Sequence, residues 1–234
     1  MATYRILSLD GGCIRGLTGA VASAVPTCHV PRARPAGEPA DPASWHAIPE
    51  LPPFRRADGS GPAEHATRLR LCQDGAALHV RFDCVDPDVW ATHTRRDAPL
   101  WEEEVVEVFL APGPEDPPSY FELEVNPLGA AFDAIVRNPH GDRRGMEVGT
   151  GWDCPGLLAS ATIDRPGGGW SAWLTIPWAP LVTDGPVPDV WRANFYRIER
   201  PRGGPAEFSC WSPTDTEPAD FHRPARFGRL VLGP

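Results

Sequence analysis

The stretch Thr67–Val85, TRLRLCQDGAALHVRFDCV, decides the fold class because two alternating segments flank a tight-turn signal. On both sides of Asp74-Gly75, polar and apolar residues alternate, as expected of strands with one face toward a core. Asp-Gly favours a two-residue turn, since glycine accepts the positive φ that such a turn requires. The stretch therefore predicts an antiparallel β-hairpin.

Seven further segments carry short β-type patterns, and no segment after residue 25 keeps a 3.6-residue apolar period over ten residues. Turn-forming runs such as Asn126–Gly129 separate the segments. Many short strands without helices between them predict an all-β fold, an antiparallel two-sheet β-sandwich of jelly-roll type. The expected strands are Val105–Ala111, Tyr120–Asn126, Ala131–Arg137, Leu158–Ile163, Trp170–Pro177, Trp191–Arg200 and Phe227–Leu232.

The chain opens with a different signal, YRILSLDGGCIRGL (Tyr4–Leu17), which is an apolar run followed by a glycine turn. It resembles the opening strand and oxyanion loop of patatin-like phospholipases, with Cys13 in place of the third glycine. A lipid acyl hydrolase of that kind needs a G-x-S-x-G nucleophile elbow, and no serine of the chain lies in that frame. We therefore predict that residues 1–25 are a leader and that residues 26–234 form the folded domain.

Between residues 25 and 53 repeated prolines predict an extended wrap rather than a helix, with Trp45 and Phe54 as its anchors. Six cysteines show no CxxC pair and no zinc spacing, so we expect buried thiols. Cys72 and Cys84 flank the hairpin, which leaves a facing pair as the alternative. The cysteines are residues 13, 28, 72, 84, 154 and 210.

Composition excludes several classes of function. The net charge is −9, from 22 Lys plus Arg against 31 Asp plus Glu, and no basic run occurs, which argues against nucleic acid or an anionic membrane as partner. No stretch of about 20 apolar residues is present, so no transmembrane segment is expected. Gly16–Val25 resembles a signal-peptide core but is too short to assign, and localisation and oligomeric state stay open.

Five pieces of sequence occur in an order that resembles carbohydrate-binding module family 9. They are, in chain order, the hairpin strand Ala77–Asp88, W-x-x-x-x-V-E-V-F from Trp101, F-x-L-x-V-N-P-x-G from Phe121, N-F-x-R from Asn194 and P-x-x-F-G-x-L from Pro224. The resemblance covers residues 26–232. It implies a jelly-roll β-sandwich that binds a sugar or oligosaccharide without catalysis, in many relatives with structural calcium but no other cofactor.

The resemblance also implies site residues. Trp101 matches the tryptophan that stacks on one face of the sugar, and Glu107 matches a carboxylate that binds its hydroxyls. Phe221 lies where the family has a second stacking tryptophan, with His222 beside it, and Asn194 matches a family asparagine. A departure is Glu124, which stands where the family has a binding arginine.

Alternatives remain for the acidic residues. On one strand face Glu107 lies between Val105 and Phe109, so it needs a partner or a ligand, and Arg197 is a candidate structural partner. Glu107, Glu122 and Glu124 could also supply the carboxylate pair of a glycoside hydrolase, although no motif selects a pair. A sandwich that has lost its ligand is the third alternative.

Overall fold

The predicted hairpin consists of β3 (Thr67–Gln73) and β4 (Ala77–Cys84), which pair antiparallel. The Asp74 carboxylate closes its turn by accepting hydrogen bonds from the backbone N–H groups of Ala76 and Ala77, at 2.9 and 3.0 Å. Gly75 has a φ of +89°, which a residue with a side chain rarely adopts. The Asp-Gly pair thus fixes the register of the hairpin.

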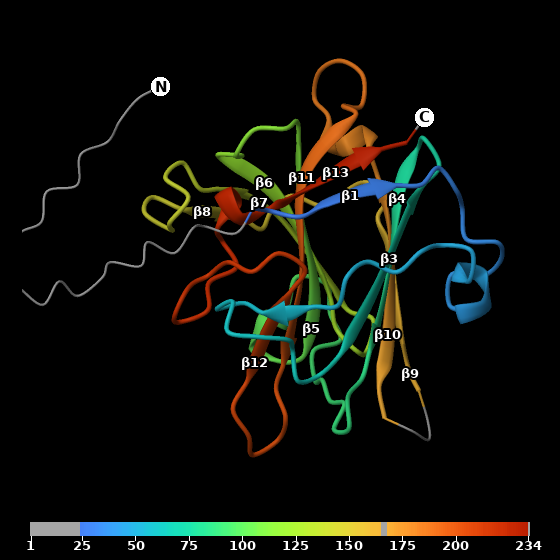
Figure 1. The fold of residues 1–234 in the computed structure, drawn as a ribbon, viewed down its shortest axis with the longest axis vertical. Helices are drawn as coiled ribbons and strands as arrows, with labels where there is room; N and C mark the ends of the chain where they lie inside the picture. Colours follow the sequence, from blue (N-terminus) through green and yellow to red (C-terminus); the bar gives the residue numbers. More distant parts are fainter. Residues whose placement is uncertain (1–23, 165–167, 234) are drawn as a thin grey trace, which may run out of the picture.

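The structure is a computed structural model that describes residues 24–164 and 168–233, and these residues form two facing β-sheets (Figure 1). The smaller sheet has the strand order β3-β4-β10-β9, with β9 at Leu158–Ile163 and β10 at Trp170–Pro177. Every pairing in it is antiparallel.

The larger sheet has nine strands in the order β1-β13-β11-β5-β6-β7-β8, with β12 beside β11 and β2 beside β12. All of its pairings are antiparallel except the parallel pair β1–β13. Its strands are β1 (Thr27–Val30), β2 (Arg55–Arg56), β5 (Val105–Pro112), β6 (Ser119–Val125), β7 (Ala131–Arg137), β8 (Glu147–Gly149), β11 (Val190–Glu199), β12 (Glu207–Cys210) and β13 (Gly228–Leu232).

Helical structure in the described residues is limited to four short 3-10 segments. They are η1 (Pro42–Trp45), η2 (Leu100–Glu102), η3 (Ala179–Leu181) and η4 (Pro224–Arg226). None of the described helices is long and apolar enough to cross a bilayer. The all-β, two-sheet sandwich expected from the sequence is therefore confirmed.

The core lies between the sheets and follows strand alternation. Val106, Val108 and Leu110 of β5 point inward and pack in one cluster with Val80 and Phe82 of β4. The intervening residues of β5 therefore point to the outer face of the nine-stranded sheet. A second apolar cluster covers that outer face, which also carries the candidate site.

The N-terminal part of the domain behaves as the proline pattern predicts. Trp45, the last residue of η1, and Phe54 are buried, and loops connect them. The pairing partner of Cys72 is His79, and that of Cys84 is Thr67, so the two thiols do not face each other. All five described cysteines are free, whereas Cys13 and the Tyr4–Leu17 stretch lie outside the described residues.

Candidate functional site

A second apolar cluster covers the outer face of the nine-stranded sheet. It includes Phe109 of β5, Tyr120 of β6, Phe132 of β7 and Tyr196 of β11. Loops from residues 143–150 and 219–222 close over this cluster and leave a cavity of about 410 Å³. That volume lies within the range of small-molecule sites. The cavity is lined by Trp101, Glu107, Glu122, Phe132, Arg143, Met146, Val148, Thr150, Ile198, Arg200, Phe208, Ala219, Phe221 and His222.

Trp101 forms one wall of the cavity and is 41% exposed, an unusual state for a large indole. It lies in η2, where the neighbouring Leu100 is fully buried and anchors the turn. The ring of Phe132 meets the indole edge-on, with centroids 5.2 Å apart, and Arg200 donates a hydrogen bond to the Trp101 carbonyl. The indole is therefore held in place while part of its surface stays open.

Phe221 and His222 come from the loop between β12 and β13. Phe221 stacks on Tyr196 with ring centroids 4.2 Å apart, and the Tyr196 hydroxyl donates to the Phe221 carbonyl at 2.9 Å. His222 Nδ1 lies 2.7 Å from the Tyr120 hydroxyl. Burial, followed by the nearby Arg143, lowers the pKa of His222 to about 4, so its ring is neutral at neutral pH.

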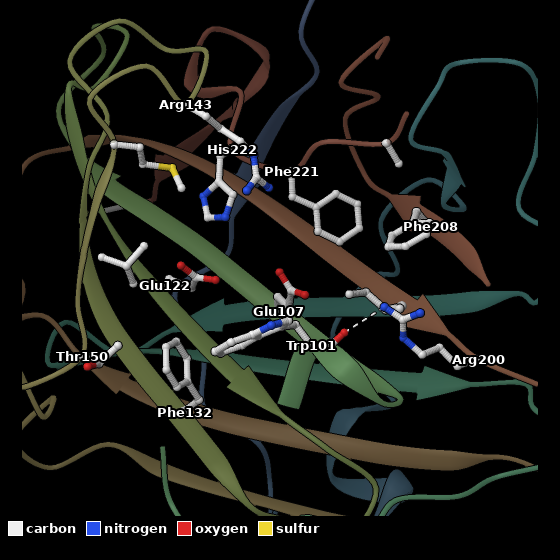
Figure 2. A pocket seen from close by; sticks show the side chains of 14 residues that line it. Trp101, Glu107, Glu122, Phe132, Arg143, Thr150, Arg200, Phe208, Phe221 and His222 are labelled. Atoms are coloured by element: carbon white, nitrogen blue, oxygen red, sulfur yellow. Dashed lines mark hydrogen bonds between the residues drawn. The ribbon is translucent and has the colours of Figure 1, made fainter. Parts of the chain in front are cut away.

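Three carboxylates lie beneath these rings. Glu107 of β5 pairs with Glu124 across the β5–β6 ladder, and Glu122 is two residues from Glu124 on the same face. One oxygen from each residue lies within 4.8 Å of the others. Figure 2 shows the Glu107 and Glu122 carboxylates between the Trp101 indole and the rings of Phe221 and His222. We call these three residues the outer triad.

The outer triad is buried without a cation. Exposure is 2% for Glu107, 6% for Glu122 and 1% for Glu124, and none of the three forms an ion pair with any described residue. Within the described part of the chain, no group outside the triad forms a hydrogen bond with either oxygen of Glu124. This arrangement is costly for three ionised groups.

Burial is the main cause of the shifted pKa values in the outer triad. Burial raises the pKa of Glu107 well above its ordinary value, and the charge of Glu122 raises it further. Burial also raises the pKa of Glu124 well above its ordinary value, and the charges of Glu107 and Glu122 add to this rise. Burial also raises the pKa of Glu122, but only to about 7, because a hydrogen bond shared with Glu124 and the charge of Arg143 lower it. The triad therefore holds protons at higher pH than exposed carboxyl groups do.

Two other groups of carboxylates in the described residues have the spacing of a metal site, but each already contains a guanidinium. The first group, which we call the inner triad, consists of Asp86, Glu104 and Glu199. Arg197 forms an ion pair with Glu199 and lies 3.4 Å from Asp86. In the third group, Arg96 pairs with Asp133 and Asp153.

This bears on the calcium that the family resemblance implies. A guanidinium in the middle of a carboxylate group fits poorly with a calcium ion in the same place. The inner triad and the Arg96 group are therefore weak calcium sites, and calcium stays a prediction.

The structure brings Trp101, Glu107, Phe221 and His222 into one cavity but leaves Asn194 outside its lining. Asn194 lies on the same sheet face, is fully buried, and binds both the N–H and the carbonyl of Ser212. This placement favours a role in holding the β12–β13 loop. Glu107 forms no ion pair with any described arginine, and Arg197 points to the opposite face of the sheet, toward Asp86 and Glu199.

Comparison with known proteins agrees with this geometry. The family described as carbohydrate-binding family 9 matches residues 62–232. The chain belongs to carbohydrate-binding family 9. A curated relative, an extracellular protein of Arthroderma benhamiae, is 27% identical over 178 residues, which are 71% of this chain and 78% of the relative.

Solved structures share the fold of this family 9 module. A Bacteroides uniformis protein, provisionally described as carbohydrate-binding, has a TM-score of 0.72 at 18% identity over 90% of this chain and 100% of its own. A family 9 module of Caldicellulosiruptor kristjanssonii in complex with glucose has a TM-score of 0.60 at 14% identity, covering 88% of this chain and 95% of its own. The same organism's module with cellotriose has a TM-score of 0.57 at 14% identity, covering 88% and 93%.

Several lining residues have no motif in the sequence. Arg143, Met146, Val148 and Thr150 belong to a loop around the three-residue strand β8, whose pattern is too short to detect. Arg200 and Phe208 flank the β11–β12 connection. Strand alternation does indicate Glu122, because it shares its face with Glu124.

Proposed function

We propose that this family 9 module binds a sugar in the cavity between Trp101 and Phe221, and that it does so without catalysis. The observation that carries the proposal is the partly exposed Trp101 indole fixed above buried carboxylates. The C–H face of a pyranose is apolar and packs on an indole, while its hydroxyls need polar partners such as Glu107 and Glu122. Family relatives crystallised with glucose and cellotriose support this ligand class.

Phe221 contributes to the proposed site as part of a rigid wall. It is only 6% exposed and is stacked on Tyr196, so it offers an edge or a small area of ring rather than an open platform. His222 is neutral and already engaged at Nδ1, which limits it to one further hydrogen bond. We therefore expect Trp101 to supply most of the stacking energy.

A calorimetric titration with glucose and cellotriose tests the proposal. The wild type is expected to bind, and Trp101→Ala is expected to bind at least about tenfold more weakly, since truncating a tryptophan that dominates a binding site costs about 2 kcal/mol or more. Leu158→Ala, which removes an exposed apolar side chain from β9 in the other sheet, is the matched control and should leave the affinity unchanged. Equal binding by wild type and Trp101→Ala would contradict the proposal.

We propose that the module is not catalytic because the carboxyl groups of the outer triad bind protons too readily for a glycosidase. A retaining glycosidase needs one stably ionised nucleophile and one acid, whereas burial raises the pKa of both Glu107 and Glu122. We expect no release of reducing sugar from cello-oligosaccharides. Release that disappears in Glu107→Gln would establish a hydrolase instead.

We also propose that sugar binding requires no cofactor. The polar groups of the cavity are the protein's own side chains, and the inner triad already holds a guanidinium. Affinity for cellotriose measured with EDTA should therefore equal that measured with calcium. A loss of affinity in EDTA would show that calcium supports the site.

A further inference from the structure

We infer that the sugar taken by this cavity carries a protonated amine, so that the ligand class is an amino sugar whose ammonium lies against Glu107 and Glu122. This inference rests on the proposed sugar-binding function and specifies its ligand. The observation behind it is a concentration of buried acidic groups in a cavity otherwise lined by rings, aliphatic side chains and rim arginines.

The first step of the argument is the missing counter-charge. The inner triad and the Asp133 group each contain an arginine within ion-pair distance, whereas the outer triad has none in the described residues. Glu124 is 1% exposed, and no described group outside the triad forms a hydrogen bond with its oxygens. A cation that reaches the triad can displace the protons of its carboxyl groups and supply the missing counter-charge.

The second step concerns the charged groups around the outer triad. Arg143 and Arg200 line the cavity, but Arg143 Nε donates to Asp220 at 2.6 Å and Arg200 donates to the Trp101 carbonyl at 3.0 Å. They act on Glu107 only through their field. From the other elements packed against the triad, His222 is neutral, and the Tyr120 and Tyr196 hydroxyls bond to His222 and to the Phe221 carbonyl. No described cationic group therefore lies within ion-pair distance of the outer triad, although Arg143 and Arg200 line the same cavity.

The third step selects an amine over a metal ion. Glu107 and Glu122 line the cavity, while Glu124 lies beneath them and outside the lining. Calcium takes six to eight oxygen ligands, and beyond these carboxylates the lining is mainly apolar, aromatic or cationic. An ammonium group needs only three acceptors, and the two carboxylates that line the cavity, Glu107 and Glu122, together offer four oxygens.

The ring that carries the amine also fits. An amino sugar keeps the apolar C–H face that packs on Trp101, and its cationic nitrogen is attracted to the electron-rich indole face as well as to the carboxylates. N-acetylation removes that charge and adds bulk, so an N-acetyl sugar lacks the interaction.

Calorimetry with glucosamine, glucose and N-acetylglucosamine at pH 7 in the presence of EDTA tests the inference. The wild type is expected to bind glucosamine at least about tenfold more tightly than glucose, with N-acetylglucosamine no tighter than glucose. Glu122→Gln and Glu107→Gln should each reduce the preference for glucosamine to less than about threefold. Glu147→Gln is the matched control, because it removes an exposed carboxylate from β8 beside the cavity, and it should keep the preference.

The outcomes separate this inference from the function on which it rests. Binding of glucose and glucosamine with equal affinity would overturn the amino-sugar inference and leave sugar binding intact. A preference that persists in both Gln variants, or that is lost equally in Glu147→Gln, would also overturn it. So would a preference that appears only when calcium replaces EDTA. Absence of binding by every sugar would overturn both.

Discussion

The inner and outer triads place two similar sets of buried carboxylates on opposite faces of the same sheet. Both take a residue from β11 or its partner β5, and both have carboxylate pKa values raised by burial, to about 9 for Glu104 and to about 7 for Glu122. Arg197 is fully buried within the inner triad and also donates to the Val85 carbonyl at 3.0 Å. The outer triad has no such arginine among residues 24–164 and 168–233, and it opens into a cavity.

The difference separates structure from function. An arginine that is enclosed with its carboxylates stabilises the fold and leaves no place for a ligand. Carboxylates that are buried without a cation cost stability, and their position beside an aromatic cavity supports the proposed binding role. We therefore expect the two triads to respond in opposite directions to removal of charge.

The largest change in the free energy of unfolding is expected for a substitution of Arg197. Arg197→Met leaves Asp86 and Glu199 buried without their partner, which typically costs about 3–5 kcal/mol of unfolding free energy. Urea unfolding measures this loss. Arg137→Met is the control, because the Arg137–Glu147 pair is exposed on both sides and should change stability by less than about 0.5 kcal/mol. A loss at Arg197 no larger than at Arg137 would remove the contrast between the triads.

An intermediate effect of opposite sign is expected at Glu122. Its pKa is about 7 in the folded protein and near 4.5 when unfolded, so between these pH values the folded state binds more protons and stability falls as pH rises. The full shift corresponds to roughly 3 kcal/mol as an upper limit. Glu122→Gln should flatten this slope and be more stable than wild type at pH 7, in urea unfolding from pH 5 to 8. A destabilised variant with an unchanged slope would contradict the assignment.

The smallest effect is expected at Arg143, on the rim of the outer triad. Its side chain is 52% exposed, and its field opposes a bound ammonium. Arg143→Gln should bind glucosamine about two- to fivefold more tightly, an effect that weakens with added salt and is of the size measured for partly exposed charge interactions. Calorimetry at two salt concentrations measures it. Weaker binding of both glucosamine and glucose would instead identify Arg143 as a ligand contact.

Much of the sandwich could be predicted from sequence because its strands alternate regularly. Thr67–Gln73, Ala131–Arg137, Leu158–Ile163 and Trp170–Pro177 occur with the predicted bounds. The sequence does not predict β1, β2, β8 and β12, since each has four residues or fewer, which is too short for a clear alternation. β1 and β2 in addition depend on partners distant in sequence, β13 and β12.

The candidate site was predictable only in part. The spacing of Trp101 and Glu107 follows from η2 leading directly into β5, and the family motif marks both. The enclosure of the outer triad depends on loops around residues 143–150 and 219–222, whose sequences carry no periodic signal. Asn194 shows the limit of motif matching, because its matched amide is used by the Ser212 backbone.

The most direct test of the central claim is an NMR titration with glucose and glucosamine that follows the indole N–H signals of the nine tryptophans. The Trp101 signal is assigned as the one that disappears in Trp101→Phe. The claim that the outer-triad cavity is the sugar site predicts that this signal shifts on binding while those of the fully buried Trp170 and Trp191 in the core between the sheets stay in place. Sugar binding that moves other indole signals and leaves that of Trp101 unchanged would contradict it.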